Sequence, residues 1–300
     1  MSDFKRYEYV IAVAECGGVS LAAQKLGIAQ PTLSRYIKKI EEELGLELFD
    51  RKELPLRPTS AGKCYIEAGK KLLYTELQLK KRIGEIRDRK NAVVRVGISP
   101  SRSPYMMPAI VSQFKAKRPE AKLIIEERKT EELAERLEAG ELDIIISLFD
   151  KSTEKFEREE LFFEDLLLAV KICDNAAASA EAVMLSTPLI SVGHGQTMWR
   201  SLHSVAEKIG APEAKIECQS IESALSLARC GLGATLVPSY IKDFGGERND
   251  SLLFLPLPES QNAEKRRVAL FWKKEQHLTD AERDFVLSVK EALATKNFKE

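Results

Sequence analysis

Residues 17–51 read GGVSLAAQKLGIAQPTLSRYIKKIEEELGLELFDR, two helical patterns separated by a short turn. Gly27 suits the left-handed residue that ends a first helix, and Pro31 suits the first turn of a second, where its missing N–H costs nothing. One face of the second helix, 31–44, repeats apolar residues at helical spacing and should be buried: Leu33, Ile37, Ile40 and Leu44. Two short helices joined in this way form a helix-turn-helix, so DNA is the first candidate partner.

The second helix begins with polar side chains that suit DNA. Gln pairs with adenine, Arg with guanine, and Ser or Thr with either base. Because the start of this helix enters the major groove in helix-turn-helix proteins, we predict these DNA contacts: Gln30, Pro31, Thr32, Ser34, Arg35 and Lys38, the last on phosphate. The alternative is a surface helix with a solvated basic side. Ser20 is the predicted N-cap of the first helix.

A longer motif carries a family resemblance. Residues 22–51, followed by Pro58-Thr59-Ser60-Ala61-Gly62, resemble the N-terminal domain of LysR-type transcriptional regulators. The family pattern has an AA-x-x-L helix, a Q-P-[AST]-[LV]-S-R recognition helix, an LEEELG-x-x-LF-x-R segment and a closing L-T-x-A-G. The resemblance extends to the rest of the chain by length and layout. It implies an α/β protein with a winged helix-turn-helix, a long linker helix and a two-lobed effector domain like that of periplasmic binding proteins.

The wing departs from the family pattern. Residues 52–57 read KELPLR, with two basic residues and one acid, and Pro58 stands where Leu is usual. The minor-groove contact that the family implies for this wing therefore depends on Arg51 and Arg57.

A long amphipathic helix is expected from about residue 60 to residue 89, with Thr59 as its N-cap. Its apolar stripe has a seven-residue repeat and several flanking members: Tyr65, Leu72, Leu79 and Ile86, with Ile66, Leu73, Leu77 and Ile83. A stripe of this length calls for a partner helix, which predicts that two subunits pair there. The alternative is packing on its own domain. The resemblance implies the same pairing, and two dimers that form a DNA-bending tetramer.

From residue 91 the pattern changes to strands alternating with helices, which predicts open, mostly parallel sheets. Strands are expected at 93–98, 122–127, 143–147, 161–170, 189–192, 216–218, 234–237 and 268–272, and helices at 104–117, 130–139, 198–209, 221–230 and 279–296. The predicted domains are 1–62 for DNA binding, 63–90 for the linker helix and 91–300 for the effector. Within the last, lobe I comprises 91–164 and 265–300, and lobe II comprises 165–264.

Polar residues follow several of these strands. Ligands of open α/β sheets bind beyond the carboxyl ends of strands, often at helix N-termini. Residues 99–104 read SPSRSP, whose hydroxyls and Arg suit a carboxylate, phosphate or sulfate, although Ser103 could simply cap the next helix and Arg102 could point to solvent. Family effector sites resemble the full set, which draws on both lobes: Ser99, Pro100, Ser101, Arg102, Thr130, Ser147, Phe149, Gly195, Gln196, Thr197, Ile221 and Glu222. A small anionic effector is the expected ligand, and Phe149 is expected to form part of the apolar wall of its site.

Composition narrows the remaining classes. Basic and acidic residues number 46 each, so the net charge of the chain argues neither for nor against DNA binding. Residues 63–90 are locally basic, with nine basic residues against four acidic ones. No apolar run reaches membrane-spanning length, and MSDFKRYEYV lacks the layout of a signal peptide, so we expect a cytoplasmic protein that binds no membrane. The five scattered cysteines include no C-x-x-C pair and fit a reducing compartment.

An enzyme is disfavoured. The three histidines have no metal-ligand spacing, and neither a G-x-S-x-G elbow nor a P-loop occurs, so no catalytic residue, cofactor or metal is expected. Cys218 and Cys230 leave a redox sensor of the same architecture as the alternative, against which buried, inert cysteines are favoured. The expected partners are double-stranded DNA with an interrupted palindrome, a small anion, and a second copy in a homodimer or homotetramer, with RNA polymerase as a further candidate.

Overall fold

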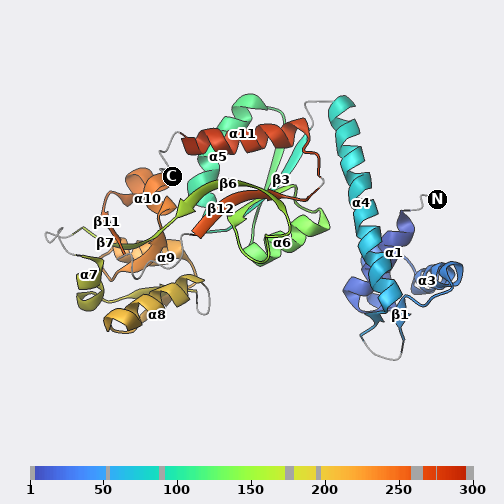
Figure 1. Ribbon diagram of the computed structural model, residues 1–300, viewed down its shortest axis with the longest axis horizontal. Coiled ribbons are helices and arrows are strands. Elements are labelled where there is room, and N and C mark those ends of the chain that lie inside the picture. Colours follow the sequence, from blue (N-terminus) through green and yellow to red (C-terminus); the bar gives the residue numbers. More distant parts are fainter. Residues whose placement is uncertain are drawn as a thin grey trace. The chain divides into compact units, whose positions relative to one another are not determined.

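The computed structural model describes residues 4–51, 55–87, 92–172, 179–193, 197–257, 266–274 and 276–294. The chain divides into two compact units, Met1–Arg89 and Lys90–Glu300 (Figure 1). No helix in the described ranges is long and apolar enough to cross a membrane.

The first unit is a winged helix-turn-helix followed by a long helix. Its elements are α1 (Lys5–Cys16), α2 (Val19–Leu26), α3 (Gln30–Leu44), the antiparallel strands β1 (Phe49–Asp50) and β2 (Arg57–Pro58), and α4 (Ser60–Arg87). One buried cluster joins α1, α2, α3 and the segment that leads into the wing: Val10, Ala12, Val13, Ala22, Ala23, Leu33, Ile37, Ile40, Leu48 and Phe49. The small residues of α2 allow the helices to approach closely, as their position in the motif predicts.

The ends of these helices confirm two predictions and correct two others. Gly27 has φ +66° and closes α2, and Thr59 Oγ1 accepts a hydrogen bond from Gly62 N at 3.0 Å at the start of α4. Ser20 is not the N-cap of α2, because the helix already begins at Val19 after an extended Gly18. Leu44 is not part of the core: it is the last residue of α3 and is 43% exposed, because the helix extends past the cluster.

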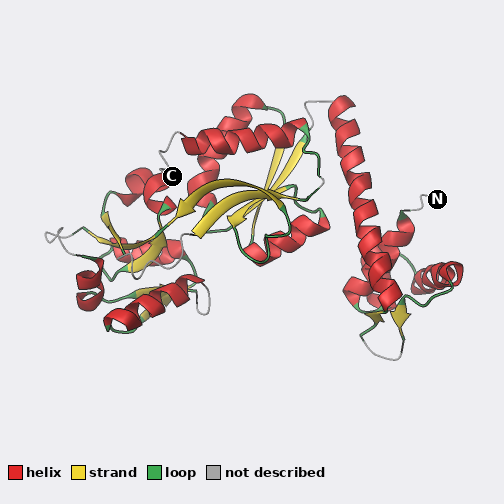
Figure 2. Cartoon of the chain, viewed as in Figure 1, coloured by secondary structure: helices red, strands yellow, loops and turns green. Residues whose placement is uncertain are grey.

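Lobe I of the second unit is a five-stranded sheet with helices on its faces (Figure 2). It comprises β3 (Val93–Ile98), α5 (Ser103–Lys117), β4 (Lys122–Glu127), α6 (Thr130–Ala139), β5 (Ile144–Leu148), β6 (Glu157–Glu164), β12 (Arg266–Trp272) and α11 (Asp280–Ala294). The strand order is β4-β3-β5-β12-β6. Alternation along the strands sends Val94, Val96 and Ile98 to the cluster under α5 and α11, while Gly97 faces Leu133 of α6.

Lobe II contains the remaining strands and helices. They are β7 (Leu166–Lys171), α7 (Ala180–Ser186), β8 (Ile190–Val192), α8 (Thr197–Ile209), β9 (Ile216–Cys218), α9 (Ile221–Arg229), β10 (Thr235–Pro238), α10 (Tyr240–Gly245), the 3₁₀ helix η2 (Gly246–Asn249) and β11 (Leu252–Pro256). The sheets are β10-β7-β11 and β8-β9, and a single bridge between Leu189 and Ala234 connects them.

Two predictions about the strands are wrong. The stretch 161–170 is not one strand: β6 ends at Glu164 in lobe I and β7 begins at Leu166 in lobe II, because the chain crosses between lobes at Asp165. The sheets are also not mostly parallel. β12 pairs antiparallel with both β5 and β6, and β7 pairs antiparallel with both β10 and β11. The strand that brings the chain back into lobe I must run opposite to the strand that leaves it (Figure 1).

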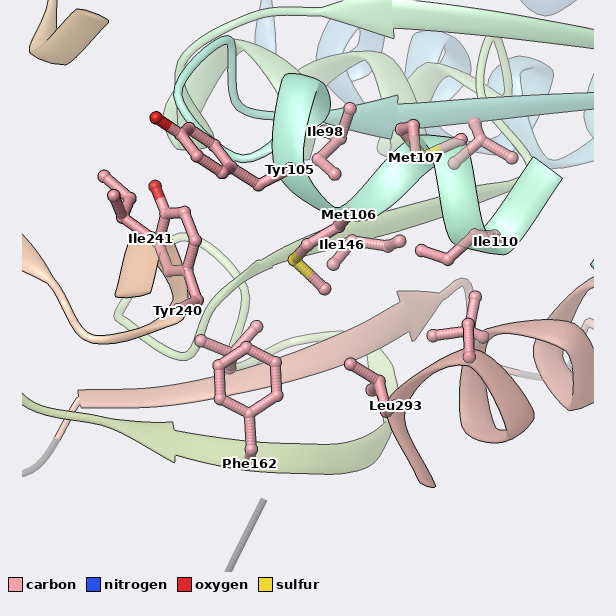
Figure 3. Close-up of a cluster of buried hydrophobic side chains, with 14 of the residues drawn as sticks. Ile98, Tyr105, Met106, Met107, Ile110, Ile146, Phe162, Tyr240, Ile241 and Leu293 are labelled. Carbon is pink, nitrogen blue, oxygen red and sulfur yellow. The ribbon is translucent and has the colours of Figure 1, made fainter. Parts of the chain in front are cut away.

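The two lobes share one hydrophobic cluster. Ile98, Tyr105 and Met106 of lobe I belong to it together with Tyr240 and Ile241 of lobe II. Figure 3 shows these side chains gathered around α5. The Tyr105 and Tyr240 rings meet edge to face, with centroids 6.1 Å apart. The lobes are therefore packed together on the α5 side rather than linked only by the crossing strands.

Candidate DNA interface and effector site

The start of α3 presents the predicted DNA-contacting residues on its surface. Leu33, Ile37 and Ile40 are buried on one side of the helix. The side chains on the remaining surface are exposed: Gln30, Pro31, Thr32, Ser34, Arg35 and Lys38. Lys38 lies 3.7 Å from Glu42, a surface pair that a phosphate can replace at little cost. The helix begins without a side-chain hydrogen bond at its cap, and Thr32 N donates to Ala29 O at 3.0 Å.

The start of the wing is fixed by a buried carboxylate. Glu41 is 7% exposed and accepts hydrogen bonds from Leu48 N at 2.8 Å and from Arg51 Nη2 at 2.6 Å. Arg51 is therefore held at one end by α3, while its side chain remains 58% exposed. Arg57 lies on β2 with an exposed side chain. Residues 52–54 of the wing lie outside the described residues.

The apolar stripe of α4 divides into two parts. Tyr65 and Ile66 pack against the core of their own unit, and Arg6 Nε donates to the Tyr65 hydroxyl at 2.8 Å. Farther along, large apolar side chains are exposed: Leu72 at 42%, Leu77 at 37%, Leu79 at 56% and Ile83 at 55%. Packing against its own unit thus accounts only for the first turns of α4. The side chain of Ile86 lies outside the described residues. The exposed part is the surface on which a second helix would fit.

In lobe I, the predicted effector residues gather where β3 and β5 end. These strands are parallel neighbours, with Ile98 opposite Ile146, so the residues that follow them lie at the same edge of the sheet. Ser147 Oγ donates to Thr130 Oγ1 at 2.9 Å. Ser99 Oγ and Ser101 Oγ are 3.3 Å apart, both half-buried. Pro100 between them is exposed. Two separate pairs of hydroxyls therefore lie at this edge of the sheet, one at the start of α5 and one at the start of α6.

Arg102 is buried, contrary to the expectation that it could point to solvent. It is 4% exposed, and its Nη2 lies 2.8 and 2.9 Å from the two carboxylate oxygens of Glu164, which is fully buried. Its Nη1 donates to Ser99 Oγ at 3.2 Å. Burial opposes the guanidinium charge, but Glu164 outweighs that effect, and the pKa of Arg102 is raised. The pair joins the start of α5 to the last residue of β6, so Arg102 shapes the site through Ser99.

Arg266 is a site residue that the sequence analysis missed. It begins β12, and its Nε lies 3.3 Å from Glu164, the carboxylate that already pairs with Arg102. Its Nη1 donates to Met198 Sδ of lobe II at 3.5 Å, a weak acceptor. Burial lowers the pKa of Arg266, and Glu164 offsets this only in part. Among the described residues, two guanidiniums thus share one carboxylate between the lobes, so two positive charges face one negative charge. Nothing in the sequence pattern distinguishes Arg266 from its neighbour Arg267.

Phe149 has a different environment from the apolar pocket wall that was predicted. It lies between two cations: the Arg158 guanidinium is 4.3 Å from its ring centroid, and that of Arg267 is 5.5 Å away. Arg267 also pairs with Glu160 at 2.8 Å. Ile145, Ser147 and Phe149 are alternate residues along β5 and just beyond its end, so their side chains point to the same face of the sheet. Ile145 and Phe149 pack in the cluster under α6, which places the stack on the face that α6 covers.

The lobe II candidates are only partly described. Gly195 and Gln196 lie outside the described residues, as does the side chain of Thr197, the first residue of α8. Ile221 is 7% exposed and belongs to the shared core, so it supports the site without offering a free surface. Glu222 is half-buried and comes next to Tyr105 of lobe I, whose pKa is raised by burial and by this carboxylate.

The described cysteines are neither buried nor paired. Cys64 and Cys230 are exposed, while Cys16 and Cys218 are half-buried. The expected burial of Cys218 and Cys230 is therefore wrong, and Cys173 lies outside the described residues. No group of three or more potential metal ligands occurs in the part of the chain that the structure describes.

Comparisons with known proteins bear on both units. The model described as "Bacterial regulatory helix-turn-helix protein, lysR family" matches residues 4–63, and "LysR substrate binding domain" matches residues 87–294, which is more than half of the chain. A hydrogen peroxide-inducible genes activator of Pectobacterium carotovorum subsp. carotovorum is 28% identical over 276 residues, covering 90% of each protein.

Solved structures share the fold along the whole chain. A full-length OxyR variant from Pseudomonas aeruginosa has a TM-score of 0.65 at 22% identity, covering 99% of this chain and 96% of that one. Full-length CbnR in complex with its target DNA has a TM-score of 0.58 at 21% identity, covering 97% of this chain and 99% of that one. At these identities the similarity defines the fold alone.

Proposed function

Because the chain belongs to the LysR family of DNA-binding transcriptional regulators, we propose that it binds an interrupted palindrome as a homo-oligomer and that a small anion between its lobes controls it. The observation that carries the effector assignment is the pair of guanidiniums, Arg102 and Arg266, that share the Glu164 carboxylate between the lobes, beside the Ser99 hydroxyl that accepts from Arg102. Glu164 is paired with both Arg102 and Arg266, so one negative charge faces two positive charges. An anion bound beside Arg266 would balance the second positive charge.

The DNA assignment draws on α3 and on α4. The six exposed residues of α3 are those whose hydrogen-bonding groups match base edges and phosphates. The exposed apolar stretch of α4 supports a dimer, and a two-fold dimer places two copies of α3 on half-sites separated by whole helical turns. CbnR, a protein of the same fold, has been solved on its target DNA.

The first test is selection from sheared genomic DNA by the purified full-length protein, followed by sequencing of the bound fragments. A small number of sharp sites with an interrupted palindrome is the expected result, and neighbouring genes would nominate the effector. Uniform, salt-sensitive binding to all fragments, unchanged by added carboxylates, would contradict sequence-specific regulation.

The effector site is tested by comparing neighbouring residues. A panel of aromatic and aliphatic carboxylates is screened for a rise in the unfolding temperature of the full-length protein. Ser101→Ala and Arg266→Met should each weaken the response to an active compound, while Lys122→Met, exposed at the start of β4 and therefore at the opposite edge of the sheet, should not. A normal dose response in both site variants would remove these residues from the effector site.

A cysteine-based sensor is the rival function, and the name of the Pectobacterium relative favours it. Cys218 ends β9 and Cys230 follows α9, a helix of nine residues that is about 13 Å long. A disulfide requires Cα atoms about 4.4–6.8 Å apart, so this pair could form only if α9 unfolded. Under the proposed function, peroxide should leave operator binding unchanged, and conversion of Cys218 and Cys230 to Ser should leave the response to carboxylates unchanged. A peroxide response that is lost in this variant would favour the sensor.

A further inference from the structure

Lobe II contains a cavity of about 280 Å³ that the candidate effector site does not use. It lies between α8, the start of β8 and the loop that joins α8 to β9. Eight residues line it: Leu189, Leu202, His203, Ala206, Glu207, Ala211, Glu213 and Ala214. None of them belongs to the candidate effector site between the lobes, so the cavity is a separate feature of this lobe.

The way in which the chain leaves α8 forms this cavity. Gly210, with φ +69°, ends the helix in the left-handed conformation, and Ala211 N donates to Ala206 O at 2.8 Å. The loop is thereby folded back along α8. Three of the side chains that line the space are single methyl groups, those of Ala206, Ala211 and Ala214, and they leave it unfilled. An apolar cavity of about 150 Å³ accepts benzene, so this one has room for a ring with a short polar arm.

The polar groups around the cavity accept hydrogen bonds and do not donate them. Glu207 and Glu213 are exposed at its mouth, and within the described part of the chain neither side chain has an ion-pair or hydrogen-bond partner. His203 is fixed by Trp199: the rings stack with centroids 3.9 Å apart, and Nδ1 lies 2.9 Å from Trp199 O. A carbonyl oxygen only accepts, so Nδ1 carries the proton and Nε2 of the neutral imidazole is an acceptor.

The chemistry of the lining therefore selects the class of ligand. Leu189, Leu202 and Ala206 are buried and form an apolar floor. The lining residues include two carboxylates and no Lys or Arg. A ligand that matches both parts has an apolar body and a positively charged donor group, because a carboxylate hydrogen bond to a cation is stronger than one to a neutral donor.

We propose that this cavity binds a small organic cation, a primary amine carried on a single ring. The ring would occupy the apolar floor, and the ammonium group would donate to Glu207 and Glu213 at the mouth. The interlobe site has the opposite charge preference, because two guanidiniums face one carboxylate there. The inference goes beyond the proposed function and does not depend on it, since binding of the amine requires neither DNA nor an anion.

The test is calorimetric titration of the full-length protein with benzylamine, benzyl alcohol and benzoate, which share one ring and differ in charge. Benzylamine should bind about tenfold more tightly than benzyl alcohol, as expected for two partly exposed charge contacts. The chain contains two tryptophans, so Trp272→Phe leaves Trp199, stacked on His203, as a local fluorescent reporter. Its emission should follow the benzylamine titration and should not respond to benzoate.

Two variants test the mouth and the floor separately. Glu207→Gln combined with Glu213→Gln should weaken benzylamine by about five- to tenfold and leave benzyl alcohol unchanged. Ala214→Leu, which fills the cavity, should abolish binding of both compounds. The matched control removes two exposed carboxylates elsewhere in lobe II, by Glu247→Gln combined with Asp250→Asn, and should leave the affinity for benzylamine unchanged.

Several results would overturn this site. They are the absence of saturable benzylamine binding, equal affinities for benzylamine and benzyl alcohol, and equal losses in the double Glu variant and its control. Unchanged binding in an Ala214→Leu protein that unfolds at the wild-type temperature would place the amine elsewhere; if that variant is destabilised, the charge variants decide. These titrations contain no DNA, so their outcome is separate from the DNA selection that tests the proposed function.

Discussion

The conversion of Glu164 to Gln tests how the second unit is held together at its crossing strand. Glu164 is fully buried at the last position of β6, and it is the acceptor for Arg102 at 2.8 Å and for Arg266 at 3.3 Å. Glutamine has the same size and keeps one oxygen, but it removes the only negative charge that those contacts supply. The Arg102 guanidinium, 4% exposed, would then be buried beside a second cation without the one carboxylate that pairs with both of them among the described residues.

The magnitude follows from the burial of the pair. Breaking a buried ion pair by removing one partner costs about 3–5 kcal/mol, because the remaining charge stays desolvated. For a domain of 150–250 residues each kcal/mol lowers the unfolding temperature by about 2–4 °C, so the second unit should lose on the order of 10 °C. Glu160 on the same strand is the matched control: its pair with Arg267 at 2.8 Å is about half exposed, and its conversion to Gln should cost less than about 1 kcal/mol.

The assay is differential scanning calorimetry of the full-length protein, in which the transition of the second unit is compared among wild type, Glu164→Gln and Glu160→Gln. A triple replacement of Glu164, Arg102 and Arg266 by apolar residues of similar volume should recover most of the lost stability. The desolvation cost of the carboxylate and of both guanidiniums is then removed together. If Glu164→Gln lowers the unfolding temperature no more than the Glu160→Gln control does, the reasoning is refuted, because the Glu164 carboxylate would then not be needed to neutralise the buried guanidiniums.

Three further predictions concern other parts of the chain. Arg35→Ala should weaken binding to the selected operator by about 10- to 100-fold at fixed salt, as expected for a lost base contact, while Lys71→Ala on α4 should have little effect; equal losses in an anisotropy titration would remove Arg35 from the interface. Glu41→Ala should cost about 1–3 kcal/mol in urea unfolding of the first unit, because the buried acceptor for Arg51 and for the wing backbone is lost, and an unchanged midpoint would contradict that role. Burial raises the pKa of Tyr240 to about 12, so its contribution is complete below about pH 10 and is lost as pH rises toward 12; wild type should lose up to about 2.7 kcal/mol more than Tyr240→Phe over this range, and parallel urea midpoints would contradict this.

Local patterns predicted the elements because their causes are local. The recognition helix was expected at 31–44 and occurs at Gln30–Leu44, since its buried stripe and the flanking Gly and Pro act within one or two turns. The strand at 93–98 and the helix at 130–139 agree with β3 and α6 for the same reason. The division of 161–170 into β6 and β7 could not be read locally, because both halves are apolar strand sequence and only the tertiary fold assigns them to different sheets.

The grouping of the candidate hydroxyls could be predicted from the sequence, whereas the burial of Arg102 and the position of Arg266 could not. Serines and threonines that follow strands are brought to one edge by parallel pairing, so Ser99, Ser147 and Thr130 could be grouped from sequence order. Arg102, by contrast, is separated from Glu164 by 62 positions, and its burial depends on that pairing. Sequence pattern gives a charged residue in a polar turn no reason to be buried, so solvent was the natural expectation.

The arrangement of charge also bears on how an effector could act. Arg102 and Glu164 join α5 to the crossing strand, and Arg266 shares that carboxylate while its other nitrogen meets lobe II at Met198. An anion bound to Arg266 would compete with Glu164 for this guanidinium and would strengthen the remaining pair with Arg102. Since a ligand shifts an equilibrium only by its differential affinity for two states, the anion would favour the lobe arrangement in which Arg266 is turned toward it. Loss of the effector response in Arg266→Met, with the Glu164–Arg102 pair intact, is the result that this reasoning requires.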